Sequence, residues 1–218
     1  MSDSEYKTVL LGEPGVGKEE LISKILENKF NMPGSSSSNF IRKKINLPDE
    51  KSVTLSIFDV AGQKQFRGLA KQFYKDAKVV ILVYDITNEN SFTELKEYWY
   101  KEVKQNGLKD VIFVVVANRS ELYNDMKVSN GEGKDFAKSI DAGFFCNSSL
   151  SNNGLEEMLQ YIGKKLIESN NDFDGNENKK KEEKKKSKKK KDNVLYIKFI
   201  IEYFFKFIIK FIIIFIKN

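Results

Sequence analysis

The chain has 218 residues, of which 40% are hydrophobic and 31% are charged, and this length suits one domain plus an appendage. Its single cysteine, Cys146, excludes an internal disulfide, and the absence of histidine excludes zinc sites built from His/Cys clusters. Much of the net charge of +6 comes from residues 179–191, which contain ten Lys and two Glu. The body of the chain is therefore mildly acidic and gives no indication of a nucleic-acid partner.

Apolar runs and helical spacing predict strands that alternate with helices along the chain. The predicted strands are Tyr6–Leu11, Phe40–Leu47 and Ser52–Phe58 (as a hairpin), Lys78–Tyr84, Val111–Val116 and Gly143–Cys146. The predicted helices cover residues 19–27, 66–75, 92–103, 131–140 and 155–166, with Ser91 as the cap of the third. The strands lack a polar face, which predicts an α/β fold with a mainly parallel sheet covered on both sides.

The stretch from Val9 to Glu19 predicts a phosphate-binding loop between the first strand and the first helix. It matches the pattern G-x-x-x-x-G-K through Gly12, Glu13, Pro14, Gly15, Val16, Gly17 and Lys18. Glycines allow backbone N–H groups to turn inward, the helix N-terminus adds partial positive charge, and the lysine reaches the outer phosphates. The next position, which is Ser or Thr in this pattern, is Glu19.

A second segment, Asp59-Val60-Ala61-Gly62-Gln63, directly follows the third predicted strand. An Asp at a strand end can hold Mg²⁺, a Gly can offer its backbone N–H to a γ-phosphate, and a Gln can orient the attacking water. Its position after the phosphate loop favours this reading over a simple turn.

With these segments the chain resembles a small GTPase of the Ras superfamily, in particular its Ras and Rab branches. DVAGQKQF resembles the DTAGQE-type segment, and VILVYDITNENSF is similar to the fourth strand and following turn. Asn118 lies where the guanine motif N-K-x-D begins, and Cys146-Asn147-Ser148-Ser149 resembles the E-T-S-A segment. The likeness covers about Tyr6 to Glu168 and implies a six-stranded, mostly parallel P-loop G domain with five helices.

The resemblance also implies ligands and roles. It implies GTP and GDP as ligands with Mg²⁺, and exchange-factor, GTPase-activator and effector proteins as partners. By motif position, the loop from Gly12 to Glu19 and Gly62 hold phosphates, and Gln63 positions water. The residues expected around guanine are Asn118, Arg119, Glu121, Ser148 and Ser149. The expected metal ligands are Asp59, Ser37 (Ser35 if a gap is allowed) and, as an alternative to weakened metal binding, Glu19.

Departures from the family pattern in three segments of the chain open a second hypothesis. Glu19 places a negative charge beside the triphosphate, and Pro14 removes one N–H donor from the loop. Glu121 is longer than the family's Asp, and Arg119 replaces its Lys. The loop SSSSNF lacks the Thr-Ile-Gly or Thr-Ile-Glu sequence that is usual in the family. The chain is therefore either a slow GTPase or a degenerate GTPase that serves as a binding module.

The expected organisation is a G domain over residues 1–168, a disordered polybasic linker over 169–193 and a hydrophobic or amphipathic tail over 194–218. Lys198, Glu202, Lys206 and Lys210 recur at every fourth residue of the tail, which favours an in-plane helix on an anionic membrane over a transmembrane anchor. As a third alternative, the tail, which consists largely of Phe, Ile, Lys and Asn, comes from an incorrectly predicted end of the gene and has no function. No prenylation site is expected, and the predicted location is the cytoplasm or the cytoplasmic face of a membrane.

Overall fold

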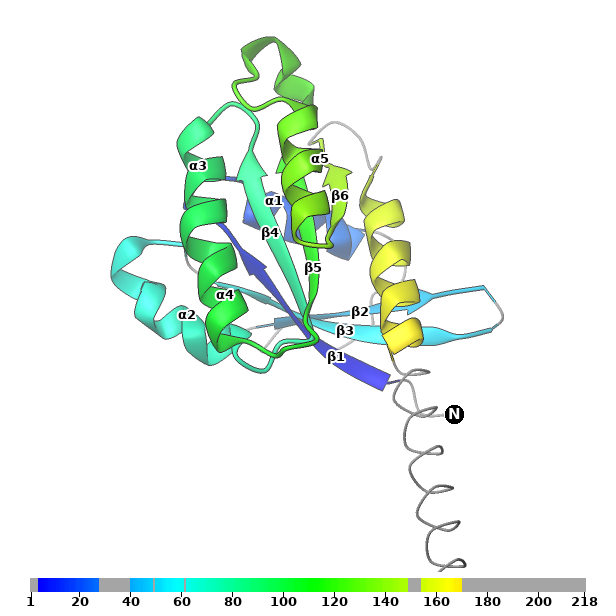
Figure 1. Ribbon diagram of the computed structural model, residues 1–218. Coiled ribbons are helices and arrows are strands. Elements are labelled where there is room, and N and C mark those ends of the chain that lie inside the picture. Colours follow the sequence, from blue (N-terminus) through cyan, green and yellow to red (C-terminus); the bar gives the residue numbers. More distant parts are fainter. Residues whose placement is uncertain (1–3, 28–39, 49, 61, 149–153, 170–218) are drawn as a thin grey trace, which may run out of the picture. The chain divides into compact units, whose positions relative to one another are not determined.

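A six-stranded sheet with the order β2-β3-β1-β4-β5-β6 forms the centre of the computed structural model (Figure 1). The structure describes residues 4–27, 40–48, 50–60, 62–148 and 154–169. Only β2 runs antiparallel to its neighbour; the other pairs are parallel. The strands are β1 Ser4–Leu11, β2 Phe40–Asn46, β3 Ser52–Asp59, β4 Val79–Asp85, β5 Ile112–Asn118 and β6 Gly143–Cys146. The structure thus confirms the predicted α/β G-domain fold, with the β2–β3 hairpin and with β5 extended to Asn118.

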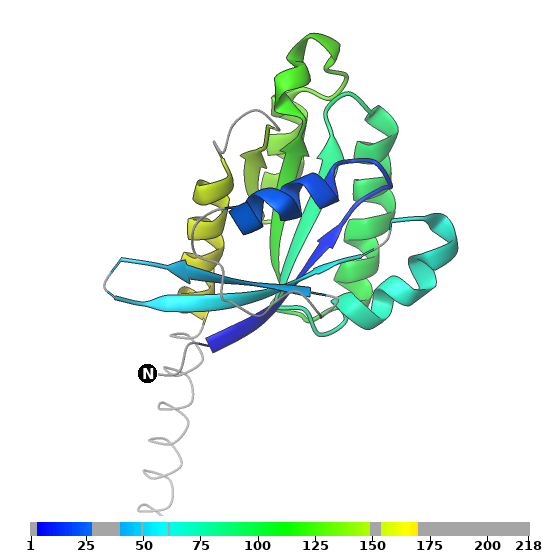
Figure 2. The same ribbon diagram turned by 180° about the vertical axis from the view of Figure 1, so that it is seen from behind.

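The strands bury both of their faces because alternate residues point to opposite sides of the sheet. On β1, Val9 and Leu11 belong to the cluster packed with α2 (Arg67–Tyr74), α3 (Glu89–Glu94) and α5 (Asn130–Ser139), while Leu10 belongs to the cluster packed with α1 (Lys18–Glu27). Figure 2 shows α1 on the side of the sheet opposite α3 and α5. The central strands therefore have no polar face, as their near-continuous apolar sequence predicts.

Helices cover both faces and fall close to the predicted ranges. They are α1 Lys18–Glu27, α2 Arg67–Tyr74, α3 Glu89–Glu94, α4 Lys101–Asn106, α5 Asn130–Ser139 and a last helix over residues 155–169. A 3₁₀ turn, Lys64–Phe66, precedes α2, and a π-helical segment, Leu95–Tyr100, joins α3 to α4.

The prediction that Ser91 caps the third helix was wrong, because the cap is Asn88, about one turn earlier. The Asn88 side chain accepts from the Ser91 backbone N–H at 3.2 Å and caps α3, which begins at Glu89. Ser91 is buried inside the helix, where its hydroxyl donates to the Asn88 carbonyl at 2.6 Å. Asn and Ser are both good capping residues, so local sequence alone did not separate them.

The chain divides into one unit over residues 1–167 and a second over residues 168–218. The predicted basic linker and hydrophobic tail lie, apart from residue 169, outside the described residues. Within the part that the structure describes, no helix has the length and apolar character needed to cross a membrane.

Candidate functional site

The predicted phosphate-binding loop runs from Gly12, directly after β1, to Lys18, the first residue of α1. Gly17 has a φ of 87°, and a Cβ at this position would overlap the Asn118 side-chain amide. Only glycine therefore permits this path. Val16 packs into the apolar cluster beneath the loop, and Pro14 is exposed.

Lys18 is 2% exposed, and its ammonium group lies over the loop. Its Nζ donates to the carbonyl oxygens of Gly12 at 3.2 Å and Glu13 at 3.0 Å. Burial lowers the pKa of Lys18, and the nearby negative charges of Asp59, Glu19 and Glu13 partly offset this effect. The loop thus holds one buried cation whose nearby counter-charges come from α1, β3 and the loop itself.

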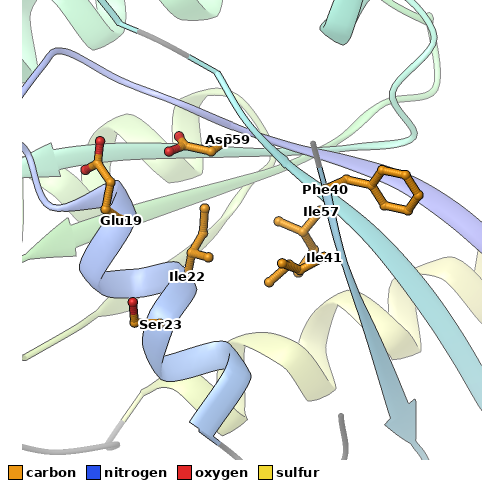
Figure 3. Close-up of a pocket in the computed structure, with 7 residues that line it drawn as sticks. All are labelled: Glu19, Ile22, Ser23, Phe40, Ile41, Ile57 and Asp59. Carbon is orange, nitrogen blue, oxygen red and sulfur yellow. The ribbon is translucent and has the colours of Figure 1, made fainter. Parts of the chain in front are cut away.

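Asp59 ends β3 and lies beside the first turn of α1. It remains accessible to solvent, yet desolvation by the surrounding protein raises its pKa, Lys18 opposes this rise, and the Glu19 carboxylate adds to it. Two carboxylates therefore lie near each other where the sequence predicts the metal. Both carboxylates line a pocket of about 300 Å³ between α1 and the β2–β3 hairpin. In Figure 3 they lie above the side chains of Ile22, Ile41 and Ile57.

The donor set fits Mg²⁺ better than a metal that needs an all-protein cage. No group of three or more His, Cys, Asp or Glu side chains suited to a metal occurs among the described residues. Mg²⁺ is commonly held by one or two carboxylates together with substrate phosphates and water. Asp59 and Glu19 carry carboxylate oxygens that could serve as such ligands, next to the predicted phosphate loop.

Gly62 lies directly against the phosphate loop. A Cβ on it would overlap the carbonyl oxygen of Gly12 and would lie 2.9 Å from the Glu13 carbonyl carbon. Gln63 follows, is exposed, and accepts a hydrogen bond from Gln65 Nε2 at 3.3 Å. The segment after β3 thus reaches the loop through its glycine, and the glutamine is the next residue.

Asn118 joins the predicted guanine side of the site to the phosphate loop. Its Nδ2 donates to the carbonyl oxygens of Val16 at 2.7 Å and Gly17 at 3.3 Å. The side chain of Asn147 in turn donates from Nδ2 to Asn118 Oδ1 at 2.6 Å. Asn147 was not among the predicted site residues. It lies in the segment Cys146-Asn147-Ser148-Ser149, in which only Ser148 and Ser149 were predicted to lie near guanine.

Arg119 and Ser148 are tied to residues that the sequence did not single out. Arg119 has a φ of 61°, and its Nη1 donates to the buried Asp85 carboxylate at 2.7 Å. The Ser148 carbonyl accepts a hydrogen bond from Lys24 on α1. Glu121 lies in a 3₁₀ segment, Ser120–Asp125, next to Arg119. Ser35, Ser37 and Ser149 lie outside the described residues.

This loop between β1 and α1, with a buried lysine and with segments after β3 and β5 packed against it, defines a P-loop α/β domain. The family model described as "Ras: Ras family" matches residues 7–168, about three-quarters of the chain. The chain therefore belongs to the Ras family of small GTPases, as the motifs predicted.

Curated relatives agree with this assignment. Ras-related protein Rab-21 of Mus musculus is 37% identical over 166 residues, which are 75% of this chain and 74% of that protein. Ras-related protein RabJ of Dictyostelium discoideum is 32% identical over 165 residues, 75% of this chain and 64% of that protein. GTP-binding protein ypt3 of Schizosaccharomyces pombe is 30% identical over 162 residues, 73% of this chain and 75% of that protein.

Proposed function

We propose that this protein binds GTP and GDP together with Mg²⁺, hydrolyses GTP slowly and acts as a switch at a membrane surface. The observation that carries the proposal is the convergence of three segments on one loop. Lys18 comes from the loop itself, Gly62 from the segment after β3, and Asn118 from the end of β5. In parallel α/β sheets, ligands bind beyond the carboxyl ends of the strands, where these segments meet.

Phosphate binding is assigned to the loop from Gly12 to Glu19 and to Gly62. Lys18 would exchange its two loop carbonyls for phosphate oxygens, which are stronger partners because they are charged. Asp59, Ser37 and Glu19 are the proposed ligands of the Mg²⁺, which would neutralise developing phosphate charge when bound. Two alternatives stand for Glu19: it binds the metal from a shifted position, or its negative charge beside the triphosphate weakens binding of Mg²⁺ and nucleotide relative to a hydroxyl, and we favour the second.

Hydrolysis is assigned to water oriented by Gln63. The water oxygen would bond to the γ-phosphorus as the bond from that phosphorus to the β–γ bridging oxygen breaks, which gives GDP and inorganic phosphate. One proton of the water stays on the oxygen that becomes a phosphate hydroxyl, and the other passes to a phosphate oxygen or to solvent. Lys18 and the backbone N–H of Gly62 would hold the negative charge on the transferred group, which is the main protein contribution in this kind of transfer.

Guanine recognition is assigned to Asn118, Arg119, Glu121, Ser148 and Ser149. The Asn147–Asn118–Val16 chain of hydrogen bonds supports this, because it fixes the amide of Asn118 at the edge of the phosphate loop. The Arg119–Asp85 ion pair holds Arg119 beside the same edge. A carboxylate at Glu121 has the charge needed to accept hydrogen bonds from the N–H groups of guanine.

We infer a role in membrane traffic, because the relatives include Rab proteins. Exchange factors, GTPase activators and effectors are the partners expected of such a switch. The polybasic run at residues 179–191 suits an anionic membrane, with about 1 kcal/mol for each well-placed lysine. Sedimentation with phosphatidylserine vesicles tests this: the full chain should bind, and a chain ending at residue 178 should not. Equal binding of both would overturn the membrane role of the tail.

The competing function is a binding module that has lost hydrolysis, and the paired carboxylates of Glu19 and Asp59 are the observation that favours it. One experiment separates the two. Purified protein is loaded with radiolabelled GTP at several Mg²⁺ concentrations, and the bound nucleotide is analysed over time. Conversion of bound GTP to GDP supports the switch, and retained GTP without conversion supports the module. If no nucleotide is retained, the switch is refuted.

A further inference from the structure

The carboxylate of Glu13 is buried, and its partners lie outside the phosphate loop. Arg67, the first residue of α2, donates from Nη2 to Glu13 Oε1 at 2.6 Å. Trp99, which is fully buried after α3, donates from Nε1 to the same oxygen at 3.0 Å. The side chains of Arg67 and Glu13 are 13% and 11% exposed. These donors replace the water that a buried carboxylate loses.

Arg67 is held on further sides. Its Nη2 also donates to Glu94 Oε2 on α3 at 2.9 Å. Its guanidinium lies 4.1 Å from the centroid of the Tyr98 ring and 5.5 Å from that of Trp99. Two carboxylates and two aromatic faces therefore fix this arginine, and stacked guanidinium groups lose little further freedom when they bond.

The backbone of the phosphate loop also lies against Gly62, at the start of the segment that leads to Arg67. Gly62 packs against the backbone of the loop at Gly12, Glu13 and Pro14 so closely that a Cβ would clash. The chain then passes through Gln63 and a 3₁₀ turn to Arg67, which bonds to the Glu13 side chain. The phosphate loop thus contacts both ends of the short segment that carries Gln63: its backbone lies against Gly62, and its Glu13 side chain bonds to Arg67. The side chain of Gln63 itself is exposed.

We propose that Glu13 and Arg67 are positioning residues for Gln63, an inference that rests on the proposed GTPase function. Fixing both ends of a short segment removes most of its conformations. The Glu13–Arg67 ion pair keeps Gln63 next to the phosphates, and Glu94, Tyr98 and Trp99 keep Arg67 in place. When the pair is broken, the Arg67 end of the segment is released, and Gln63 spends less time where it orients water.

Single-turnover hydrolysis of GTP by the full chain with Mg²⁺ tests this. Arg67→Gln should slow hydrolysis about tenfold, on the scale of a small misplacement of a catalytic group, while the GTP dissociation constant changes less than about threefold. Lys71→Ala is the matched control: Lys71 lies one turn further along α2 and bonds to Asn106 instead of the loop. It should hydrolyse GTP at the wild-type rate.

The decisive comparison uses Gln63→Leu. Because Arg67 acts through Gln63, Arg67→Gln should cause no further slowing in the Gln63→Leu background. An arginine that only stabilises the fold would slow both backgrounds equally or weaken GTP binding, and either result would overturn the proposal. Arg67→Lys, which keeps the charge but loses the planar fork, should give an intermediate rate.

Trp99 supplies a readout independent of turnover, because it is the only tryptophan of the chain and touches Glu13. Its fluorescence should change in Glu13→Gln and Arg67→Gln but not in Lys71→Ala; an unchanged spectrum in both cluster variants would count against the contact. The wild-type protein is measured first. Absence of wild-type turnover would refute the proposed hydrolysis and the positioning role together, whereas wild-type turnover with equally fast Arg67→Gln would refute only the positioning role.

Discussion

The side-chain amide of Asn118, at the end of β5, donates to the backbone carbonyl of Val16 in the phosphate loop at 2.7 Å. Both residues are buried, and Asn147 fixes the amide's other end at 2.6 Å. This bond ties the predicted base-binding side of the domain to its predicted phosphate-binding side. The geometry of one side therefore depends on that of the other.

Asn118→Ala should weaken binding of both GTP and GDP at least tenfold. The substitution leaves the Val16 carbonyl and the Asn147 amide without this partner, a cost of about 1–3 kcal/mol for buried groups. Calorimetric titration with each nucleotide measures the loss. A matched control is Asn106→Ala. It also removes a part-buried side-chain amide, but one that bonds to Lys71 on α2 and to the Glu102 carbonyl on α4. Equal nucleotide affinity in Asn118→Ala and the wild type would contradict the prediction.

Glu19→Ser should strengthen Mg²⁺-dependent GTP binding. It removes a carboxylate whose charge acts on Asp59 and supplies a hydroxyl at that position. We expect a tighter dissociation constant for GTP with Mg²⁺ and a smaller change in EDTA. Glu20→Ser is the control, since Glu20 carries the same charge one residue on and approaches Arg119 instead. If Glu19→Ser and wild type bind Mg·GTP equally, Glu19 does not impair the metal.

Gly62→Ala should block hydrolysis while the protein stays folded. A methyl group at this position would meet the backbone of the phosphate loop, so the segment that carries Gln63 must move away. Single-turnover rates should fall about a hundredfold, as expected when a catalytic group is displaced by about 1 Å. Gly68→Ala is the control, because a Cβ there has open space around it. Wild-type hydrolysis by Gly62→Ala would show that the segment does not need this contact.

Asp59→Asn should make the nucleotide-free protein more stable at neutral pH. The pKa of Asp59 is raised in the folded protein above its ordinary value of 3.8, so folding favours the protonated form. The charged carboxylate therefore destabilises the fold above the raised pKa, and this penalty disappears as the pH falls below 3.8. Thermal unfolding with pH should show a higher Tm for Asp59→Asn at pH 7 and equal values in acid.

The same variant should lose Mg²⁺-dependent nucleotide binding at every pH, because an amide is a poorer Mg²⁺ ligand than a carboxylate. In the wild-type protein, that binding should weaken as the pH falls through the raised pKa of Asp59 and the carboxylate becomes protonated. Higher stability together with lost binding would mark Asp59 as a residue retained for function at a cost in stability. An unchanged Tm and unchanged Mg²⁺ dependence would argue against both assignments.

The sequence by itself determined the fold class and the order of its elements. Alternating apolar runs and helical spacing fix which faces are buried, and glycine patterns mark loops that only glycine can form. For that reason the local sequence was enough to predict the phosphate loop, the β2–β3 hairpin and the segment from Asp59 to Gln63. The Asn88 cap and the 3₁₀ turn before α2 were missed, because neighbouring residues have similar local preferences.

Only the tertiary structure decided which distant side chains meet. Glu13 occupies one of the unspecified positions of the G-x-x-x-x-G-K pattern, so the sequence predicts no particular partner for its side chain. In the structure it bonds to Arg67 and Trp99, which are far from it along the chain. Asn147 lies in the segment that resembles E-T-S-A but was not predicted as a site residue, yet its side chain bonds to Asn118. Such contacts depend on how helices pack across the sheet and on the partners that buried polar groups require. Sequence spacing does not contain that information.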